Sequence, residues 1–242
     1  MTQEINIIPY IQRAQDARGT AVVIDTYRGS SLINALFGLG AQEIHPIWHV
    51  DEAREIKQSL MRQHNNVLLI GEMDGITPKD FDFGNGLDAL VTNPNNASRI
   101  NGAQIVYVST NAVKGILEAS RSKANEILVG SPLNRGALLH YLADKKEVTL
   151  LPVGERDCGE QRYAEEDMLY ANYVKDILEG KKPNYEEVRC AILRGKSAQL
   201  ATQYDAEFDR DYCLNIDFYD TLPALRDGKL INIRNGNKNG KR

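Results

Sequence analysis

The sequence is poor in cysteine and histidine and has no long apolar run, and these shortages exclude several classes of protein. Its three cysteines are an odd number without the spacing of metal ligands, which predicts reduced thiols. The four histidines form no ligand pair at helical spacing, so zinc is not expected. No apolar segment could span a bilayer, and the polar N-terminus lacks a signal-peptide pattern. We therefore expect a cytoplasmic protein without a membrane partner.

Several nucleotide and hydrolase motifs are also absent. The chain has no Gly-x-Gly-x-x-Gly after a strand, no phosphate-binding loop ending in Gly-Lys-Ser/Thr and no serine hydrolase elbow. The net charge of −4 argues against nucleic acid as the main partner. The tail from Arg234 to Arg242 is basic and rich in glycine and asparagine. That composition is typical of a solvated terminus, and a phosphate-steering or nucleic-acid arm is the alternative.

What the chain does contain is an ordinary globular composition and a repeated order of elements. Its 242 residues suffice for one large α/β domain or two small ones. Strand, polar loop, helix, strand, helix, strand occurs twice, near 21–71 and near 104–154, with negligible sequence identity between the copies. Right-handed crossovers make such strands parallel, and helices then cover both faces. We predict an α/β protein with three α/β/α layers, mainly parallel mixed sheets and two architecturally similar halves.

These halves are expected at residues 1–100 and 101–230, packed closely on each other, with a flexible basic tail at 231–242. The apolar and polar patterns predict strands at 5–8, 21–25, 43–48, 67–70, 104–108, 126–129, 148–153 and 211–219. They predict helices at 31–38, 51–63, 112–120, 132–142, 163–179 and 185–200, the last interrupted at residue 195. Ser30 or Ser31 is expected to cap the first helix and Asp51 the second.

The loop that follows the buried strand at 67–70 is the first candidate site. Hard oxygen donors on a glycine-rich loop are what a Mg²⁺ ion requires, since carboxylates supply charge and glycines let the backbone bend. The alternative is that Asp and Gly are simply good turn formers. The donors of this loop are Glu72, Asp74, Asp80, Asp82 and Asn85.

Polar side chains follow the other predicted strands in the same way. The strand at 21–25 ends in Asp25, where an unpaired buried charge would be costly, and Arg28 comes just beyond it. Ligands bind at the carboxyl ends of parallel strands, and carboxylates mixed with arginine and hydroxyls suit Mg²⁺-assisted chemistry on a phosphate. The alternative is that the smaller polar residues only cap helices. The smaller residues at strand ends are Ser109, Thr110, Asn111, Ser131 and Asn134.

A second acidic cluster begins the predicted helix at 163–179. Dipole compensation explains Glu165 and Glu166, since acids favour helix N-termini. Asp167 differs, because its spacing to Ala171 and the apolar residues beyond puts it on the inward face. Arg162 lies just before the first turn, where it could pair with Glu166 or reach a phosphate.

Seven segments together resemble the signature segments of the 2-phosphosulfolactate phosphatases, in order and spacing, from about Ile5 to Ile231. They are Asp25-Thr-Tyr-Arg-Gly-Ser-Ser31, Gly71-Glu-Met-Asp-Gly75, Phe81-Asp-Phe-Gly-Asn85, Ser109-Thr-Asn111, Gly130-Ser-Pro-Leu-Asn134, Tyr163-Ala-Glu-Glu-Asp167 and Asp211-Tyr-Cys-Leu214. The resemblance implies a three-layer α/β/α fold. It also implies a Mg²⁺-dependent phosphohydrolase that removes phosphate from 2-phospho-3-sulfolactate, a step on the route to coenzyme M.

The family's polar signature residues, carried over position by position, fall on ten residues of this chain. They imply catalytic roles for Asp25, Arg28 and Glu166, metal binding for Glu72, Asp74 and Asp167, and substrate binding for Asn85, Thr110, Asn111 and Asn134. Asp25 would orient water, act as base or ligate the metal. Ser30 and Arg162 are added as candidate substrate-binding residues from their own places in the sequence.

The chain departs from the family pattern in three loops. It has Tyr27-Arg-Gly-Ser-Ser-Leu32 where the family usually has Leu-Arg-Ala-Ser-Thr/Ser-Thr, and Ala112 and Gly86-Leu87 replace Gly and Ser-Pro. The altered loops motivate two alternatives to a hydrolase of a small phosphomonoester. One is a non-catalytic homologue that binds phosphate and metal, and the other is a phosphotransferase or mutase. A homodimer is the default expectation for the oligomeric state.

Overall fold

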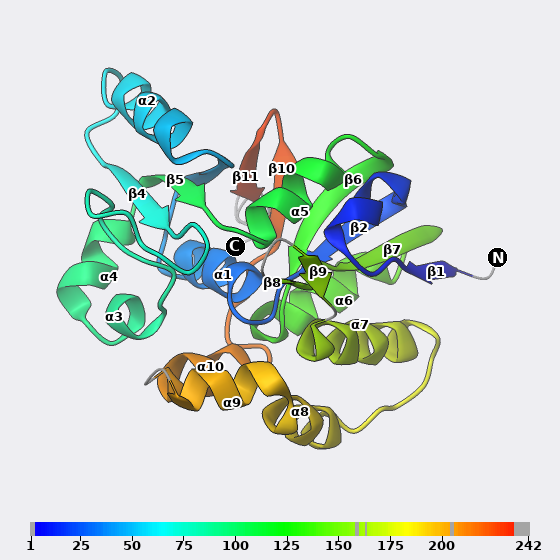
Figure 1. Cartoon of the computed structure of the whole chain (residues 1–242). Helices are drawn as coiled ribbons and strands as arrows, with labels where there is room; N and C mark the ends of the chain where they lie inside the picture. The colour runs from blue at the N-terminus through cyan, green and yellow to red at the C-terminus, as the bar shows by residue number, and fades with distance from the viewer. Residues whose placement is uncertain (1–2, 158–159, 163, 204–205, 235–242) are drawn as a thin grey trace, which may run out of the picture.

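The computed structural model describes residues 3–157, 160–162, 164–203 and 206–234. These form a mixed sheet of nine strands with helices on both faces (Figure 1), which confirms the predicted fold class. In chain order the strands of this sheet are β1 (Glu4–Ile7), β2 (Arg18–Ile24), β3 (Glu43–Pro46), β4 (Val67–Gly71), β5 (Gln104–Val108), β6 (Lys123–Gly130), β7 (Glu147–Pro152), β10 (Pro223–Arg226) and β11 (Lys229–Asn232). A separate hairpin consists of β8 (Glu155–Asp157) and β9 (Glu160–Arg162).

The helices connect these strands and cover the sheet. They are α1 (Gly29–Gly38), α2 (Val50–Leu60), α3 (Asp88–Val91), α4 (Pro94–Ile100), α5 (Ala112–Ala119), α6 (Arg135–Leu142), α7 (Glu165–Leu178), α8 (Tyr185–Arg194), α9 (Lys196–Gln203) and α10 (Glu207–Cys213), with short 3-10 helices η1 (Ile11–Asp16) and η2 (Pro132–Asn134). Within the described residues no helix is both long and apolar enough to cross a membrane.

The strand order is β1-β7-β2-β6-β10-β11-β3-β5-β4, so strands from residues 1–100 are interleaved with strands from the rest of the chain. The division into two similar halves stays a prediction. Parallel pairing joins β1, β7, β2 and β6 at one end and β3, β5 and β4 at the other. The antiparallel hairpin β10–β11 bridges the two sets. The two parallel sets therefore run in opposite directions across the sheet.

The twist of the sheet brings the carboxyl ends of both sets together. Each strand is rotated by roughly 20–25° from its neighbour, so the rotation from β2 to β5 is on the order of 100° or more. The sheet thus curves around α1 and α5, which lie between its two ends (Figure 1). The main core fills this concave side, where Leu32 and Leu36 of α1 share one apolar cluster with Val23 of β2 and Ile105 of β5.

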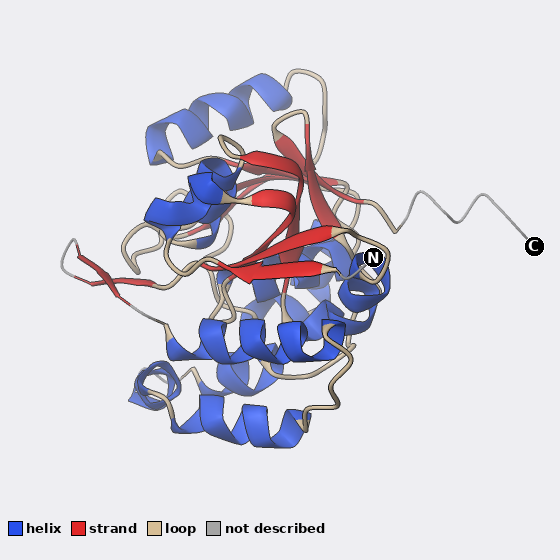
Figure 2. Ribbon diagram, turned by 90° about the vertical axis from the view of Figure 1, so that its right-hand side faces the viewer, coloured by secondary structure: helices blue, strands red, loops and turns tan. Residues whose placement is uncertain are grey.

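Two further apolar clusters lie on the convex face. Helices α6 and α7 cover the β1-β7-β2-β6 side, where Leu138 and Tyr170 pack in one cluster with Val22 and Leu150. Helix α2 covers β4 and β5 through Ala53, packed with Leu69 and Val106. Helices thus lie on both faces of the sheet (Figure 2). Neighbouring residues of a strand pack into different clusters, which explains why these strands read as unbroken apolar runs.

Most predicted elements are confirmed, but the closing strand predicted at 211–219 is wrong. Residues 207–213 form α10, and Asp217 beyond it has a positive φ of 57°. The alternation that suggested a strand instead places Cys213 and Leu214 in the interior, while Tyr212, Phe218 and Tyr219 form an aromatic cluster with Phe208. The last two described strands of the chain are β10 and β11, which lie in the middle of the sheet and are joined by the Asp227-Gly228 turn.

The predicted helix caps are also wrong. Helix α1 is preceded by Arg28 and α2 by His49, and neither end has a side-chain cap. Ser30 and Ser31 lie inside α1, where their hydroxyls donate to the backbone oxygens of Val23 and Thr26. These serines therefore fasten the helix to the loop before it.

Candidate active site

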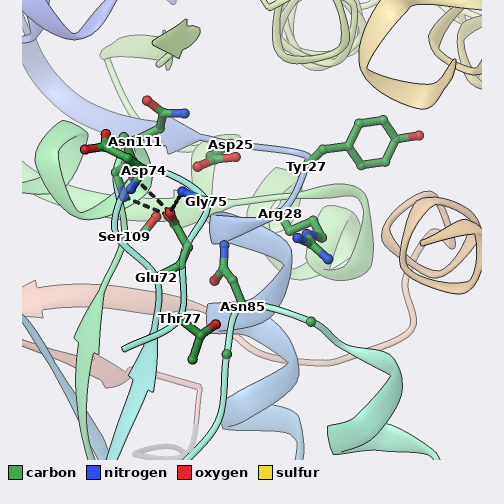
Figure 3. Close-up of a pocket in the computed structure, with 13 residues that line it drawn as sticks. Asp25, Tyr27, Arg28, Glu72, Asp74, Gly75, Thr77, Asn85, Ser109 and Asn111 are labelled. Carbon is green, nitrogen blue, oxygen red and sulfur yellow. Dashed lines mark hydrogen bonds between the residues drawn. The ribbon is translucent and has the colours of Figure 1, made fainter. Parts of the chain in front are cut away.

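An open cavity of about 730 Å³ lies where the carboxyl ends of β2, β4 and β5 meet (Figure 3). A second hollow of about 230 Å³ continues it toward α7, α9 and α10. We call these the first lobe and the second lobe. The two lobes share four lining residues, which mark their junction: Asp25, Tyr27, Arg28 and Asn111.

The β2–α1 loop supplies three of the four junction residues. Hydrogen bonds from two serines of α1 hold its backbone in place. The hydroxyl of Ser30 accepts a hydrogen bond from the backbone N–H of Asp25 at 3.0 Å. The hydroxyl of Ser31 donates to the backbone oxygen of Thr26 at 3.0 Å. Both serines are completely buried, and neither lines the cavity. The predicted substrate-binding residue Ser30 thus lies behind the loop.

Glu72 enters the first lobe because the chain makes a close crossing at Gly71. Gly71 has φ of 130°, and a Cβ atom there would lie 1.8 Å from the backbone oxygen of Val108. Only glycine permits this approach of β4 to β5. The crossing places the Glu72 side chain beside Thr110, the second residue after β5.

Three donors then fix the Glu72 carboxylate. The backbone N–H of Thr110 donates to Oε1 at 2.9 Å. Oε2 accepts from the Thr110 hydroxyl at 2.9 Å and from the N–H of Gly75 at 2.6 Å. The same hydroxyl accepts the N–H of Asp74 at 2.7 Å. Donors on both oxygens hold the side chain in one position, so Glu72 is preorganised.

Asp25 is the buried acid at the junction, with 5% of its surface exposed. Burial raises its pKa from 3.8 to about 7, against the N–H of Gly29, which lowers it. The charges of Glu166 and Glu72 raise the pKa further, while Arg28 lowers it. At neutral pH this carboxyl is therefore divided between its protonated and charged forms.

Asp167 and Glu166 line the second lobe from the first turn of α7. Asp167 accepts the N–H of Thr26 at 2.7 Å and that of Gly154 at 3.3 Å, so it ties α7 to the β2 loop. Burial raises the pKa of Asp167 well above its ordinary value, and the charges of Glu166 and Asp25 add to this. Glu166 is 6% exposed and accepts from the hydroxyl of Ser197.

Arg28 reaches the junction in an ion pair with Asp209, which sequence reasoning missed. Asp209 lies in α10, and it belongs to the stretch between the predicted helix at 185–200 and the predicted strand at 211–219, for which no element was predicted. Its signal was weak, because an isolated acid in a charged stretch is most often solvent-exposed. Here it is 4% exposed and also accepts the N–H groups of Leu87 and Asp88.

The remaining predicted residues divide into two groups. Thr110, Asn111 and Asn85 line the first lobe, and the hydroxyl of Tyr107 donates to the Asn85 side-chain oxygen at 2.7 Å. Asn134 lies elsewhere, fully buried, and its side chain bonds only backbone groups, among them the N–H of Ser131 at 2.9 Å. The position of Arg162 is in β9, and its side chain lies outside the described part of the structure.

The predicted metal ligands surround the junction without forming one cluster. Glu72 and Asp74 line the first lobe and Asp167 lines the second. Among the described residues no group of three His, Cys, Asp or Glu side chains is close enough to hold a metal ion. Two observations nevertheless fit a hard cation at the junction. The Asn111 side-chain oxygen is buried and has no hydrogen-bond partner among the described residues, and Asp25 is crowded by other acids.

Known proteins of one family match nearly the whole chain. The family described as 2-phosphosulpholactate phosphatase matches residues 7–228. A probable 2-phosphosulfolactate phosphatase of Thermoplasma volcanium is 31% identical, over 87% of this chain and 91% of the relative. Proteins of the same name are 30% identical in Thermotoga maritima, over 88% and 91%, and 28% identical in Thermoplasma acidophilum, over 87% of each chain.

Proposed function

The chain belongs to the 2-phosphosulfolactate phosphatase family, and on that premise we propose that it is a Mg²⁺-dependent phosphatase. The proposed reaction is hydrolysis of 2-phospho-3-sulfolactate to 3-sulfolactate and phosphate, a coenzyme M biosynthesis-type step in the cytoplasm. The observation that carries the proposal is the junction itself. There a half-buried arginine paired with a buried carboxylate, a preorganised glutamate and an aspartyl group with a raised pKa line the two adjoining lobes.

Arg28 would bind the phosphoryl group. Its guanidinium has five N–H donors in a planar fork, and pairing with Asp209 at Nη1 leaves donors for phosphoryl oxygens. Arg28 lines both lobes, so a phosphate on it would lie at the junction. Thr110 supports this site indirectly, because its hydroxyl is already used to hold Glu72 and Asp74.

Asp25 would give up a proton when the metal binds and would then serve as a charged ligand. In the metal-free site its pKa is about 7, so near neutral pH a cation can replace the proton at little cost. Its place between the lobes would also let the ionised carboxylate orient an attacking water. Glu166, which lines the second lobe, raises the pKa of Asp25 in the metal-free site.

The ligands we propose for Mg²⁺ are Asp25, Glu72 and the side-chain oxygen of Asn111, all at or beside the junction. Asp74 and Asp167, the other implied ligands, line the lobes on either side. Carboxylate and amide oxygens are the donors that this hard cation prefers. When bound, the ion would stabilise negative charge that develops on the phosphoryl oxygens.

Phosphate release tests the proposal. 2-Phosphosulfolactate and a panel of other phosphomonoesters are incubated with the protein, with MgCl₂ and with excess EDTA. We expect phosphate from the sulfolactate ester with metal and none with chelator. Melting shifts without product would identify a binding protein, and label transferred to an acceptor alcohol would identify a phosphotransferase. Either result would overturn the proposed hydrolase.

A further inference from the structure

Asp209 is a buried carboxylate at the point where three parts of the cavity wall meet. Only 6% of its side chain is exposed. Oδ1 accepts the backbone N–H groups of Leu87 at 2.9 Å and of Asp88 at 2.8 Å, and Oδ2 pairs with Nη1 of Arg28. One side chain therefore connects α10, the start of α3 and the β2–α1 loop.

We propose that Asp209 is a positioning residue that holds the Arg28 guanidinium ready for the phosphoryl group; this inference rests on the function proposed above. An arginine in an open cavity has many rotamers, and ordering it when substrate binds would cost entropy. The two N–H donors fix Asp209, and the fixed carboxylate fixes one edge of the guanidinium. The arginine is therefore already ordered in the folded protein, and substrate binding need not order it.

Asp209 also keeps Arg28 away from the other acids of the cavity. The charge of Arg28 already acts on Asp25, and Glu72 lies close enough to Asp25 to raise its pKa. Without a dedicated partner, the guanidinium would be drawn to these carboxylates, which are the groups proposed to receive Mg²⁺. The pair with Asp209 separates the arginine from the metal ligands.

The neighbouring backbone covers the Asp209 side of this ion pair and leaves Arg28 open to the cavity. A Cβ atom at Gly86 would lie 3.5 Å from Oδ2 of Asp209 and 4.0 Å from Nη1 of Arg28. Asp209 is thus buried against the backbone of Gly86, Leu87 and Asp88, while the Arg28 side chain keeps 35% of its surface exposed.

A double-mutant cycle tests whether Asp209 acts through Arg28. The variants are Asp209→Asn, Arg28→Ala and the combination, assayed for kcat and KM on 2-phosphosulfolactate with MgCl₂. Asp209→Asn keeps an oxygen that can accept the N–H groups of Leu87 and Asp88, and it removes the charge opposite Arg28. We expect it to lower kcat about tenfold or more, since misplaced groups lose turnover. In the Arg28→Ala background the same change should cost less than about twofold. Equal losses in both backgrounds would overturn the proposal.

Asp217→Asn is the matched control. Asp217 also pairs with an arginine, Arg135, and also accepts a backbone N–H, that of Gly136, but it does not line either lobe. Its loss should lower stability and leave kcat and KM within about twofold of wild type. A decrease in kcat equal to that of Asp209→Asn would show that losing any such ion pair slows the enzyme, which would overturn the positioning role.

The cycle can also be run without turnover. The affinity for inorganic phosphate in MgCl₂ is measured by calorimetry for the same four proteins. If wild type binds phosphate and hydrolyses no ester, the proposed function fails, but coupling between positions 28 and 209 in phosphate affinity would still support the positioning role. Additive effects, or wild type that does not bind phosphate, would overturn it.

Discussion

Asp25→Asn should stabilise the metal-free protein at neutral pH while it destroys activity. Asp25 is buried among acids, and its folded pKa of about 7 lies above the ordinary value of 3.8. A carboxyl raised in this way contributes its full stability below the unfolded pKa and loses it as the pH rises through the folded pKa. Wild type should therefore lose stability between about pH 4 and pH 7 relative to the variant.

The raised pKa sets the size of the effect. A shift of about 3 pKa units corresponds to about 4 kcal/mol, at about 1.4 kcal/mol per unit, and this is an upper limit. The asparagine oxygen can still accept the N–H of Gly29, so little is lost in exchange. For a domain of this length the limit corresponds to a rise in Tm of roughly 10 °C at pH 8. Near pH 4 most of the difference should disappear, because Asp25 is then protonated in the folded state and partly protonated in the unfolded state.

Thermal unfolding of wild type and Asp25→Asn at pH 4 and pH 8 in EDTA measures this difference in Tm.

Asp82→Asn is the control, and its expected effect on stability has the opposite sign. Burial alone would raise the pKa of Asp82, but the hydrogen bond from Lys57 and the charge of Arg99 lower it. That variant should be less stable than wild type at pH 8. An Asp25→Asn variant that is less stable than wild type at pH 8, or equally shifted at both pH values, would refute the reasoning. Saturating Mg²⁺ should narrow the gap, because the ion neutralises the wild-type cluster.

Three further predictions concern the reaction. Activity should require Mg²⁺ or Mn²⁺, because the donors are oxygens, and full activity in excess EDTA or restoration by Zn²⁺ alone would contradict this. Glu72→Gln and Asp25→Asn should each lower kcat roughly 10²-fold, since each removes a charge from a preorganised site, and the Tm should stay the same or rise. A near-normal kcat in either variant would give that residue a structural role. Arg28→Lys should lower turnover strongly while calorimetry finds Mg²⁺ affinity unchanged, because lysine cannot present a planar fork to phosphate. Loss of both together would mean that Arg28 holds the metal loops.

Periodicity and strand ends carried most of what could be predicted. Strands buried on both faces read as apolar runs. Asp25 and Glu72 follow two of them directly, and Thr110 is the second residue after a third. The burial of Asp25 and Asp167 followed from their apolar neighbours and is confirmed. The twist of the sheet explains why residues from oppositely directed strand sets meet, which no local pattern contains.

The missed features depend on contacts between distant segments. Asp209 is separated from Arg28 by 181 residues, and only the packing of α10 against the start of α3 brings them together. Asn134 and Ser30 are polar residues that follow strands, and their side chains satisfy buried backbone groups. This structural role is of the same kind as the helix capping that was the alternative to substrate binding. The Asp227-Gly228 turn was a missed element with a local signal, since Asp-Gly between short apolar runs is typical of a hairpin.

A crystal structure of the protein soaked with Mn²⁺ and a phosphate analogue such as tungstate would test the central claim most directly. Both ions scatter anomalously, so their positions can be read without refinement bias. The account predicts Mn²⁺ bonded to Glu72 and Asp25 at the junction of the lobes, and tungstate on the Arg28 guanidinium with the Asp209 pair intact. Mn²⁺ bound outside the cavity, or an anion that makes no contact with Arg28, would contradict it.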